Sequence, residues 1–171
     1  MSSVAPLLCI PVGVVVERRK AASPWAEFLW RPVAVLGGVP DTPAWTLLAV
    51  DGEMATFYAG EAALELYRSE ADKYRRNLES AVPAVWVALY ETDGDPPYTV
   101  AAVTADPAEG ESLTEPGQGI IEAVAMPEPL RHTIAAFVAE HYVERVFEKR
   151  TRDRADPEAL ARHDLRFRQR R

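Results

Sequence analysis

The chain has 171 residues, of which 48% are hydrophobic and 26% are charged. These values are typical of one globular domain and exclude a chain that is disordered throughout. The net charge of −7 is unevenly spread: residues 1–144 carry 9 Lys and Arg against 21 Asp and Glu, whereas residues 145–171 carry 10 against 5. We therefore expect a single globular domain over 1–144 and a basic tail over 145–171 that is partly helical or disordered.

The first predicted elements are two strands joined by an aromatic turn. Residues 10–17 place Ile or Val at every second position, which is typical of a strand. A Ser-Pro pair opens residues 23–28, and this pattern predicts a single helical turn there. Residues 31–36 form the second predicted strand. Cys9 lies between two apolar residues, so we expect it to be a small buried hydrophobe.

Two Asp-Gly pairs predict hairpins in the middle of the chain. Asp51-Gly52 separates two β-rich runs and suits the central positions of a type I′ turn. In that register Trp45 faces Tyr58, which would form an aromatic cross-strand pair. The second Asp-Gly pair and a Pro-rich insertion join predicted strands over 84–91 and 98–105 in a longer hairpin.

The remaining segments alternate between strand and helix. We expect a strand over 63–68 and a short helix over 70–79, with one continuous helix as the alternative. Asp106-Pro107 predicts the start of another short helix, and residues 120–126 predict a strand. The longest helix is expected over 128–144. Its buried face should consist of Leu130, Ile134, Phe137 and Val138.

This order of elements predicts an α+β fold. Hairpin links outnumber crossover helices, so the sheet should be largely antiparallel, with about six to seven strands. Short helices, a C-terminal capping helix and the basic tail complete the expected architecture.

Motifs for common chemistries are absent from the sequence. It contains no Walker loop, no dinucleotide-binding fingerprint and no nucleophile elbow. Glu128 and His132 would share a helix face, but two ligands are fewer than a zinc site needs. The acidic residues between 93 and 115 match no Ca²⁺ loop and indicate a solvated acidic loop. We predict no catalytic, cofactor-binding or metal-binding residues and no cofactor. A pocket shared by Tyr58, Tyr67, Glu128 and His132 would favour an enzyme.

Two segments are candidate partner-binding surfaces. Four large apolar residues fall within positions 25–30, and some of them should remain exposed as a contact anchor, unless all pack at the core edge. The basic tail has three interpretations: a solvated tail, a segment that folds on a partner, or a nucleic-acid contact through its arginines. It could also fold back on the acidic domain. The candidate partner-binding residues are Trp25, Phe28, Trp30, Arg150, Arg152, Arg154 and Phe167.

The N-terminal segment does not have the pattern of a signal peptide. Its apolar run is interrupted by Pro11 and Gly13, and its basic residues follow the run. No apolar stretch reaches the ~18 residues of a membrane span. With one cysteine, no intrachain disulfide can form. We therefore expect a cytoplasmic protein with no membrane span.

Several segments resemble a bacterial family that is catalogued as a domain of unknown function. They are RPVAVLGG, LELYRSEADKYRRNLES, AVWVALYE and EAVAMPEPLRHTIAAFVAEHY, together with the opening IPVGVVVERRK and the basic tail. The resemblance covers about residues 10–155. Members of this family are typically proteobacterial and are encoded beside genes for molybdenum-dependent formate dehydrogenase and its accessory factors. The resemblance implies this context and a strand in the first half of 61–80, but it supplies no site residues.

These observations together predict a non-enzymatic accessory, assembly or regulatory protein that acts through protein–protein contacts. The resemblance suggests a formate dehydrogenase subunit or maturation factor as the partner. The alternatives are a small enzyme or ligand-binding domain with an unrecognised site, and nucleic-acid binding through the tail. The acidic domain disfavours nucleic acid because it would repel a phosphate backbone.

Overall fold

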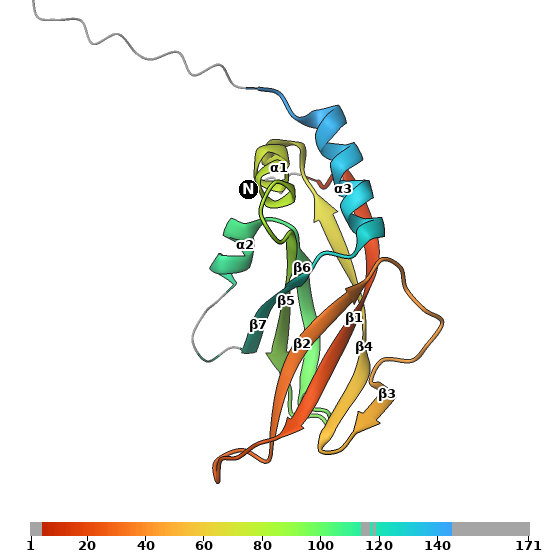
Figure 1. Cartoon of the computed structure of the whole chain (residues 1–171), viewed down its shortest axis with the longest axis vertical. Coiled ribbons are helices and arrows are strands. Elements are labelled where there is room, and N and C mark those ends of the chain that lie inside the picture. The colour runs from red at the N-terminus through yellow and green to blue at the C-terminus, as the bar shows by residue number, and fades with distance from the viewer. Residues whose placement is uncertain (1–4, 114–116, 118, 145–171) are drawn as a thin grey trace, which may run out of the picture.

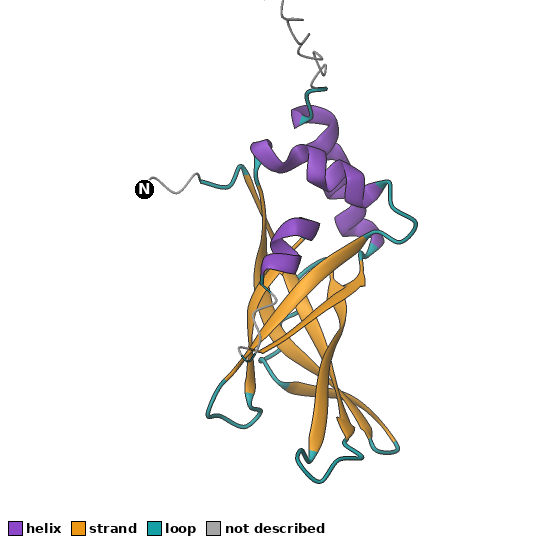
Figure 2. Ribbon diagram, turned by 90° about the vertical axis from the view of Figure 1, so that its left-hand side faces the viewer, coloured by secondary structure: helices purple, strands orange, loops and turns teal. Residues whose placement is uncertain are grey.

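The computed structural model describes residues 5–113, 117 and 119–144. Within these residues seven strands and a few short helices alternate (Figures 1 and 2). The strands are β1 (Leu8–Lys20), β2 (Phe28–Leu36), β3 (Thr46–Asp51), β4 (Met54–Leu66), β5 (Ala84–Glu91), β6 (Tyr98–Thr104) and β7 (Gly119–Ala125). The helices are a 3₁₀ turn η1 (Arg68–Glu70), α1 (Ala71–Leu78), α2 (Pro107–Ser112) and α3 (Glu128–His141).

All seven strands belong to one sheet with the order β2-β1-β4-β6-β5-β7, and β3 pairs with β4 beside this path. Every pair is antiparallel except β4 with β6, which meet in parallel at Leu64 and Val103. The sheet curls until its terminal strands β2 and β7 approach each other, which gives it a nearly barrel-like shape (Figure 1). The predicted α+β fold with a largely antiparallel sheet is confirmed.

The core fills the inside of this curled sheet. Val12, Val14 and Val16 of β1 are fully buried on the inner face. The helices gather at one end of the sheet (Figure 2), where α3 covers the core. The predicted stripe of α3 is confirmed, since Leu130, Ile134, Phe137 and Val138 are all buried. Among the described residues the opposite end carries only strands and turns, and we call it the open end.

Helix α1 is attached to the sheet by a buried amide. The Asn77 side chain donates to the carbonyl oxygens of Ala84 at 2.8 Å and Ala105 at 2.9 Å. Its own oxygen accepts from the backbone N–H of Ala84 at 3.1 Å. These bonds satisfy backbone groups at the start of β5 and just beyond the end of β6, so Asn77 joins the helix to two strands.

The predicted strand and helix over 63–79 are confirmed, and one continuous helix is excluded. The strand is longer than expected because β4 pairs with β1 along its whole length, from Met54 opposite Arg19 to Leu66 opposite Leu8. Pairing with a long neighbour determines the strand length here, and local sequence does not reveal it.

The predicted register of the first hairpin is wrong. Gly52 and Glu53 form its turn, Asp51 pairs with Met54, and the partner of Tyr58 is Thr46. An irregularity between Leu47 and Ala49 shifts the register. Trp45 adopts a positive φ of 63°, and its ring packs edge-on against Trp30, with centroids 5.8 Å apart. The second hairpin, between β5 and β6, is confirmed.

Two expectations at the start of the chain are also corrected. Residues 23–28 contain no helical turn. The chain reverses there through a loop that is closed by a 2.9 Å hydrogen bond from the Ala21 N–H to the Glu27 carbonyl. Cys9 is exposed, since it is not on the inner face of β1 that carries the core valines. Helix α3 ends at His141, three residues earlier than predicted.

Candidate functional site

Aromatic rings fill the open end of the sheet. Trp30 of β2 lies at their centre, and its ring centroid is 5.8 Å from those of Trp45 and Phe57 and 6.1 Å from that of Tyr98. Trp30, Trp45 and Tyr98 are partly buried and pack against the core. The cluster thus connects β2, β4, β6 and the residue before β3 at the end that no described helix covers.

An arginine is embedded in this aromatic cluster. Arg18 follows Val12, Val14 and Val16 at the next inward position of β1. Its guanidinium carbon lies 4.4 Å from the ring centroid of Phe28, 5.3 Å from that of Phe57 and 5.7 Å from that of Trp30. These are cation–π distances. The buried Nε of Arg18 has no hydrogen-bond partner among the described residues.

Two carboxylates close to Arg18 in the sequence or at the groove, those of Glu17 and Glu53, are bound to other cations. Glu17 is only 9% exposed, and its carboxylate contacts Arg19 at 2.6 Å and Arg31 at 3.5 Å. The carboxylate of Glu53 lies 3.6 Å from the Lys20 ammonium. Arg18 therefore forms no ion pair within the part of the chain that the structure describes.

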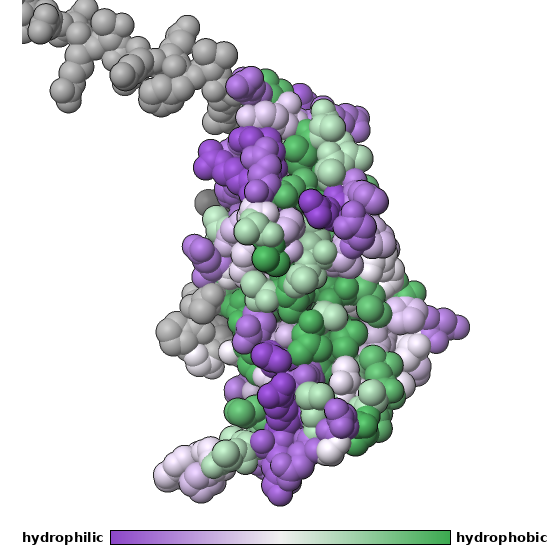
Figure 3. Space-filling model, in the orientation of Figure 1, coloured by the Kyte–Doolittle hydropathy of each residue, from purple (hydrophilic) through white to green (hydrophobic). Residues whose placement is uncertain are grey.

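A groove of about 400 Å³ lies against Arg18. We call it the Arg18 groove, and its lining includes Arg18, Lys20, Phe28, Leu47, Val50 and Phe57. One wall is β3, whose side chains Leu47 and Val50 are 52% and 63% exposed. Among the described strands β3 pairs only with β4, so its other edge carries unpaired backbone groups. Figure 3 shows hydrophobic surface where Figure 1 places β3.

Three of the predicted contact residues lie at this open end. Phe28 lines the groove, and Trp30 stacks behind Arg18. Trp25 is 93% exposed on the turn between β1 and β2, and Leu29 is 58% exposed. Of the apolar residues in the segment 25–30, the structure therefore places Phe28 and Trp30 against the sheet and leaves Trp25 and Leu29 in solvent. Arg150, Arg152, Arg154 and Phe167 of the tail lie outside the described residues.

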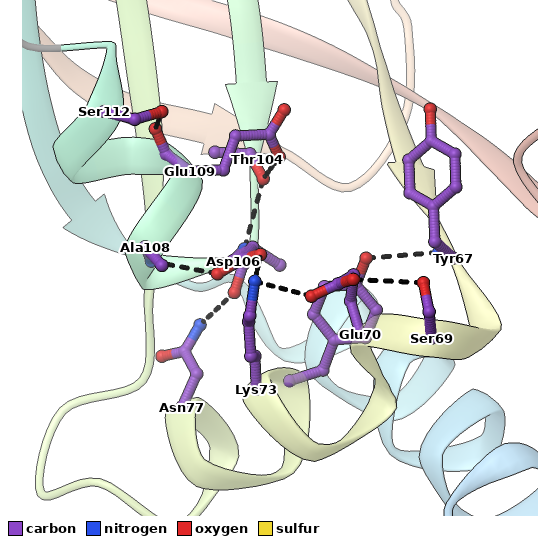
Figure 4. A network of polar contacts seen from close by, with 12 residues as sticks. Tyr67, Ser69, Glu70, Lys73, Asn77, Thr104, Asp106, Ala108, Glu109 and Ser112 are labelled. Carbon is purple, nitrogen blue, oxygen red and sulfur yellow. Dashed lines mark hydrogen bonds and ion pairs between the residues drawn. The ribbon is translucent and has the colours of Figure 1, made fainter. Parts of the chain in front are cut away.

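The helical end carries a cluster of polar side chains, shown in Figure 4. Lys73 of α1 contacts Glu70 at 2.5 Å and Asp106 at 2.9 Å. Asp106 is 4% exposed and caps α2 by accepting a hydrogen bond from the Ala108 N–H at 2.9 Å. The hydrogen bonds that the Lys73 ammonium donates to Glu70 and Asp106 raise the pKa of Lys73. Each charge here has a partner, so the cluster joins α1 to α2 as structural support.

Of the four residues whose shared pocket would favour an enzyme, only Tyr58 lines either the Arg18 groove or a second groove, beside residues 39–44. Tyr58 is buried beside a groove of about 630 Å³ formed with residues 39–44, and Tyr67 instead donates to Glu65. Glu128 and His132 form the predicted pair on the exposed surface of α3, with 3.1 Å between their side-chain atoms. No group of three or more His, Cys, Asp and Glu among the described residues is placed to hold a metal ion. No described helix is long and apolar enough to cross a membrane.

Arg18, Leu47 and Val50 were not predicted as site residues. A signal for Arg18 exists in the sequence, because a charged residue continues the inward alternation of three buried valines. Leu47 and Val50 lie on either side of the β3 irregularity. This irregularity places both side chains at the groove, and sequence periodicity does not reveal it.

The fold and the groove define an α+β protein with a curled sheet and an apolar open end. A family model described as "Protein of unknown function (DUF3305)" matches residues 11–151. The chain belongs to this family, which confirms the predicted resemblance to a domain of unknown function. No curated protein matches the chain, and no solved structure matches it.

Proposed function

We propose that this protein is a non-enzymatic accessory protein that acts through protein–protein contacts made by the open end of its sheet. The observation that carries the proposal is the set of large apolar side chains exposed at this end, on the β1–β2 turn and on β3. Trp25 is 93% exposed, and Leu47, Leu48 and Val50 of β3 are each more than half exposed. Aromatic and aliphatic anchors of this kind are typical of protein-binding surfaces.

The edge position of β3 supports the same proposal. An apolar edge strand tends to pair with other chains, so proteins usually shorten, charge or cover such strands. In β3 the sequence TLLAVD keeps five uncharged residues before its single aspartate. An edge that is left apolar is suited to a partner that covers it.

We further propose that the partner is a subunit or a maturation factor of formate dehydrogenase. The support for this partner is the sequence resemblance, which implies a genomic context beside formate dehydrogenase genes. An accessory role also agrees with a sequence that carries no motif for catalysis.

A ligand-binding domain is the second candidate. The volume of the Arg18 groove, about 400 Å³, is within the range of small-molecule sites. The groove opens along β3 and offers one unpaired cation on an apolar wall. This geometry suits an elongated amphiphilic ligand, and a polypeptide segment has that form.

Affinity capture from the source organism grown on formate tests the proposal. The full chain should recover a formate dehydrogenase subunit or maturation factor. The double variant Trp25→Ala with Leu48→Lys should recover at least tenfold less, because it removes one anchor and charges the edge strand. The matched control is Val82→Lys, which charges an exposed apolar residue outside the open end.

Two outcomes would contradict the proposal. Capture by the full chain that contains no formate dehydrogenase component would remove the proposed partner. Equal recovery by the wild type and the double variant would show that the open end is not the contact surface.

A further inference from the structure

We propose that the Arg18 groove is a carboxylate receptor that binds an extended segment of the partner protein. In this segment an Asp or Glu side chain lies two residues from an aliphatic side chain on each side. The inference rests on the proposed function, since it takes the ligand to be a polypeptide.

The charge of Arg18 indicates the first part of this ligand. The rings of Phe28, Trp30 and Phe57 surround the guanidinium and attract its charge, but no group among the described residues accepts a hydrogen bond from its N–H donors. The buried Nε is such a donor. A guanidinium presents two parallel N–H groups to a carboxylate. The surrounding rings hold the Arg18 guanidinium in place before the ligand binds.

The balance of charge at the groove indicates a single carboxylate. Lys20 and Glu53 lie 3.6 Å apart and offset each other. Of the two cations that line the groove, Arg18 is the one that forms no ion pair among the described residues. A ligand with one negative charge therefore matches the site, whereas a neutral apolar segment would bury the guanidinium without an acceptor.

The walls of the groove indicate what flanks the carboxylate. Leu47, Val50, Met54 and Phe57 all line it. In an extended chain the side chains at i−2, i and i+2 point to the same face. A carboxylate at position i would contact Arg18 while aliphatic side chains at i−2 and i+2 contact these apolar walls.

The edge of β3 indicates a polypeptide as the source of the carboxylate. This edge carries backbone N–H and C=O groups that no described strand pairs with. A polypeptide can pair with such groups, whereas a fatty acid cannot. Apolar side chains beside an unused edge thus favour a peptide over a lipid.

A peptide titration followed by NMR tests the proposal on the full chain. The probe is acetyl-Leu-Ser-Glu-Ser-Leu-amide, and its matched control has Gln in place of Glu. We expect the Glu peptide to shift the Arg18 Nε–Hε signal and the backbone signal of Val50 in a saturable manner. The Gln peptide should bind at least tenfold more weakly. This comparison requires no protein variant, so it does not depend on the folding of a mutant.

Variants then assign the effect to Arg18. Arg18→Gln should remove the preference for the Glu peptide, and Arg18→Lys should weaken binding because it keeps the charge but loses the planar fork. Arg68→Gln, an equal change of charge at the helical end, should leave the affinity unchanged. The Arg18 side chain makes no hydrogen bond within the described residues, so its replacement should preserve the fold and most of the amide spectrum.

Three outcomes would overturn the proposal. The first is equal affinity for the Glu and Gln peptides. The second is binding of octanoate at lower concentration than the peptide, which would assign the groove to a lipid-like carboxylate. The third is a shift of the same signals with protein concentration alone, which would assign it to a second copy of this chain.

The affinity capture separates this inference from the proposed function. Full recovery of formate dehydrogenase components by Arg18→Gln, with no Glu preference in the titration, would reject the groove and retain the accessory role. A Glu-specific titration with no such component captured by the wild type would reject the partner and retain the groove.

Discussion

Replacing Trp30 with alanine should lower the free energy of unfolding by about 3 kcal/mol, at the lower end of the range for large aromatic residues in cores. The Trp30 ring contacts Trp45, Phe57 and Tyr98 and stacks with the Arg18 guanidinium. Its loss would leave a cavity among three rings and remove part of the cage around the arginine. Urea unfolding followed by circular dichroism measures this change.

Trp25 provides the matched control for Trp30. It is also a tryptophan at the open end, but 93% of it is exposed. Trp25→Ala should therefore change the free energy of unfolding by less than about 0.5 kcal/mol. Equal losses for the two variants would show that the aromatic cluster does not hold the open end together.

Replacing Asn77 with alanine should lower the free energy of unfolding by about 3 kcal/mol. The substitution removes three hydrogen bonds and leaves the Ala84 carbonyl, the Ala84 N–H and the Ala105 carbonyl without this partner. Asn77 is 4% exposed, so water cannot easily replace the amide. The same urea titration measures the loss.

Ser80→Ala is the control for Asn77→Ala. The exposed Ser80 side chain lies just beyond the end of α1, and its hydroxyl donates a 2.7 Å hydrogen bond to the backbone carbonyl of Asn77. Water can take its place, so this variant should cost less than about 1 kcal/mol. If Asn77→Ala is no more destabilising than Ser80→Ala, the buried amide does not attach α1 to the sheet.

The elements that could be predicted from the sequence are those whose side chains alternate or repeat locally. The alternating residues Val12, Val14 and Val16 of β1 and the stripe of α3 each form a buried face, and periodicity identifies such faces. Asp106 was predicted correctly as the start of a helix because its carboxylate caps the nearby Ala108 N–H. These features depend on neighbours within a few residues of each other.

The features that could not be predicted depend on contacts between distant segments. The register of β3 is shifted by an irregularity beside Leu47, and the positive φ of Trp45 accompanies its packing against Trp30. The length of β4 follows from its pairing with β1. The Arg18 groove requires β1, β2, β3 and β4 together, so no single segment of the sequence reveals it.

The two ends of the molecule use their polar groups differently. At the helical end Lys73, Glu70, Asp106 and Asn77 all bind partners within the chain (Figure 4). The Nε of Arg75 at the helical end also lacks a partner among the described residues, but its other nitrogens bind Asp72 and Glu79. At the open end the whole Arg18 guanidinium has no hydrogen bond or ion pair among the described residues, and the side chains of β3 are exposed. A polar group left unsatisfied costs stability unless a ligand satisfies it, so the open end is where we place binding.

Site-specific photo-crosslinking in growing cells tests this placement most directly. A p-benzoylphenylalanine residue replaces Val50 at the groove in one full-length chain and Thr133 on the exposed surface of α3 in another. We predict that the probe at position 50 crosslinks to a partner segment with a carboxylate between aliphatic residues, and that Arg18→Gln weakens this crosslink. A crosslink from position 133 without one from position 50 would contradict the account.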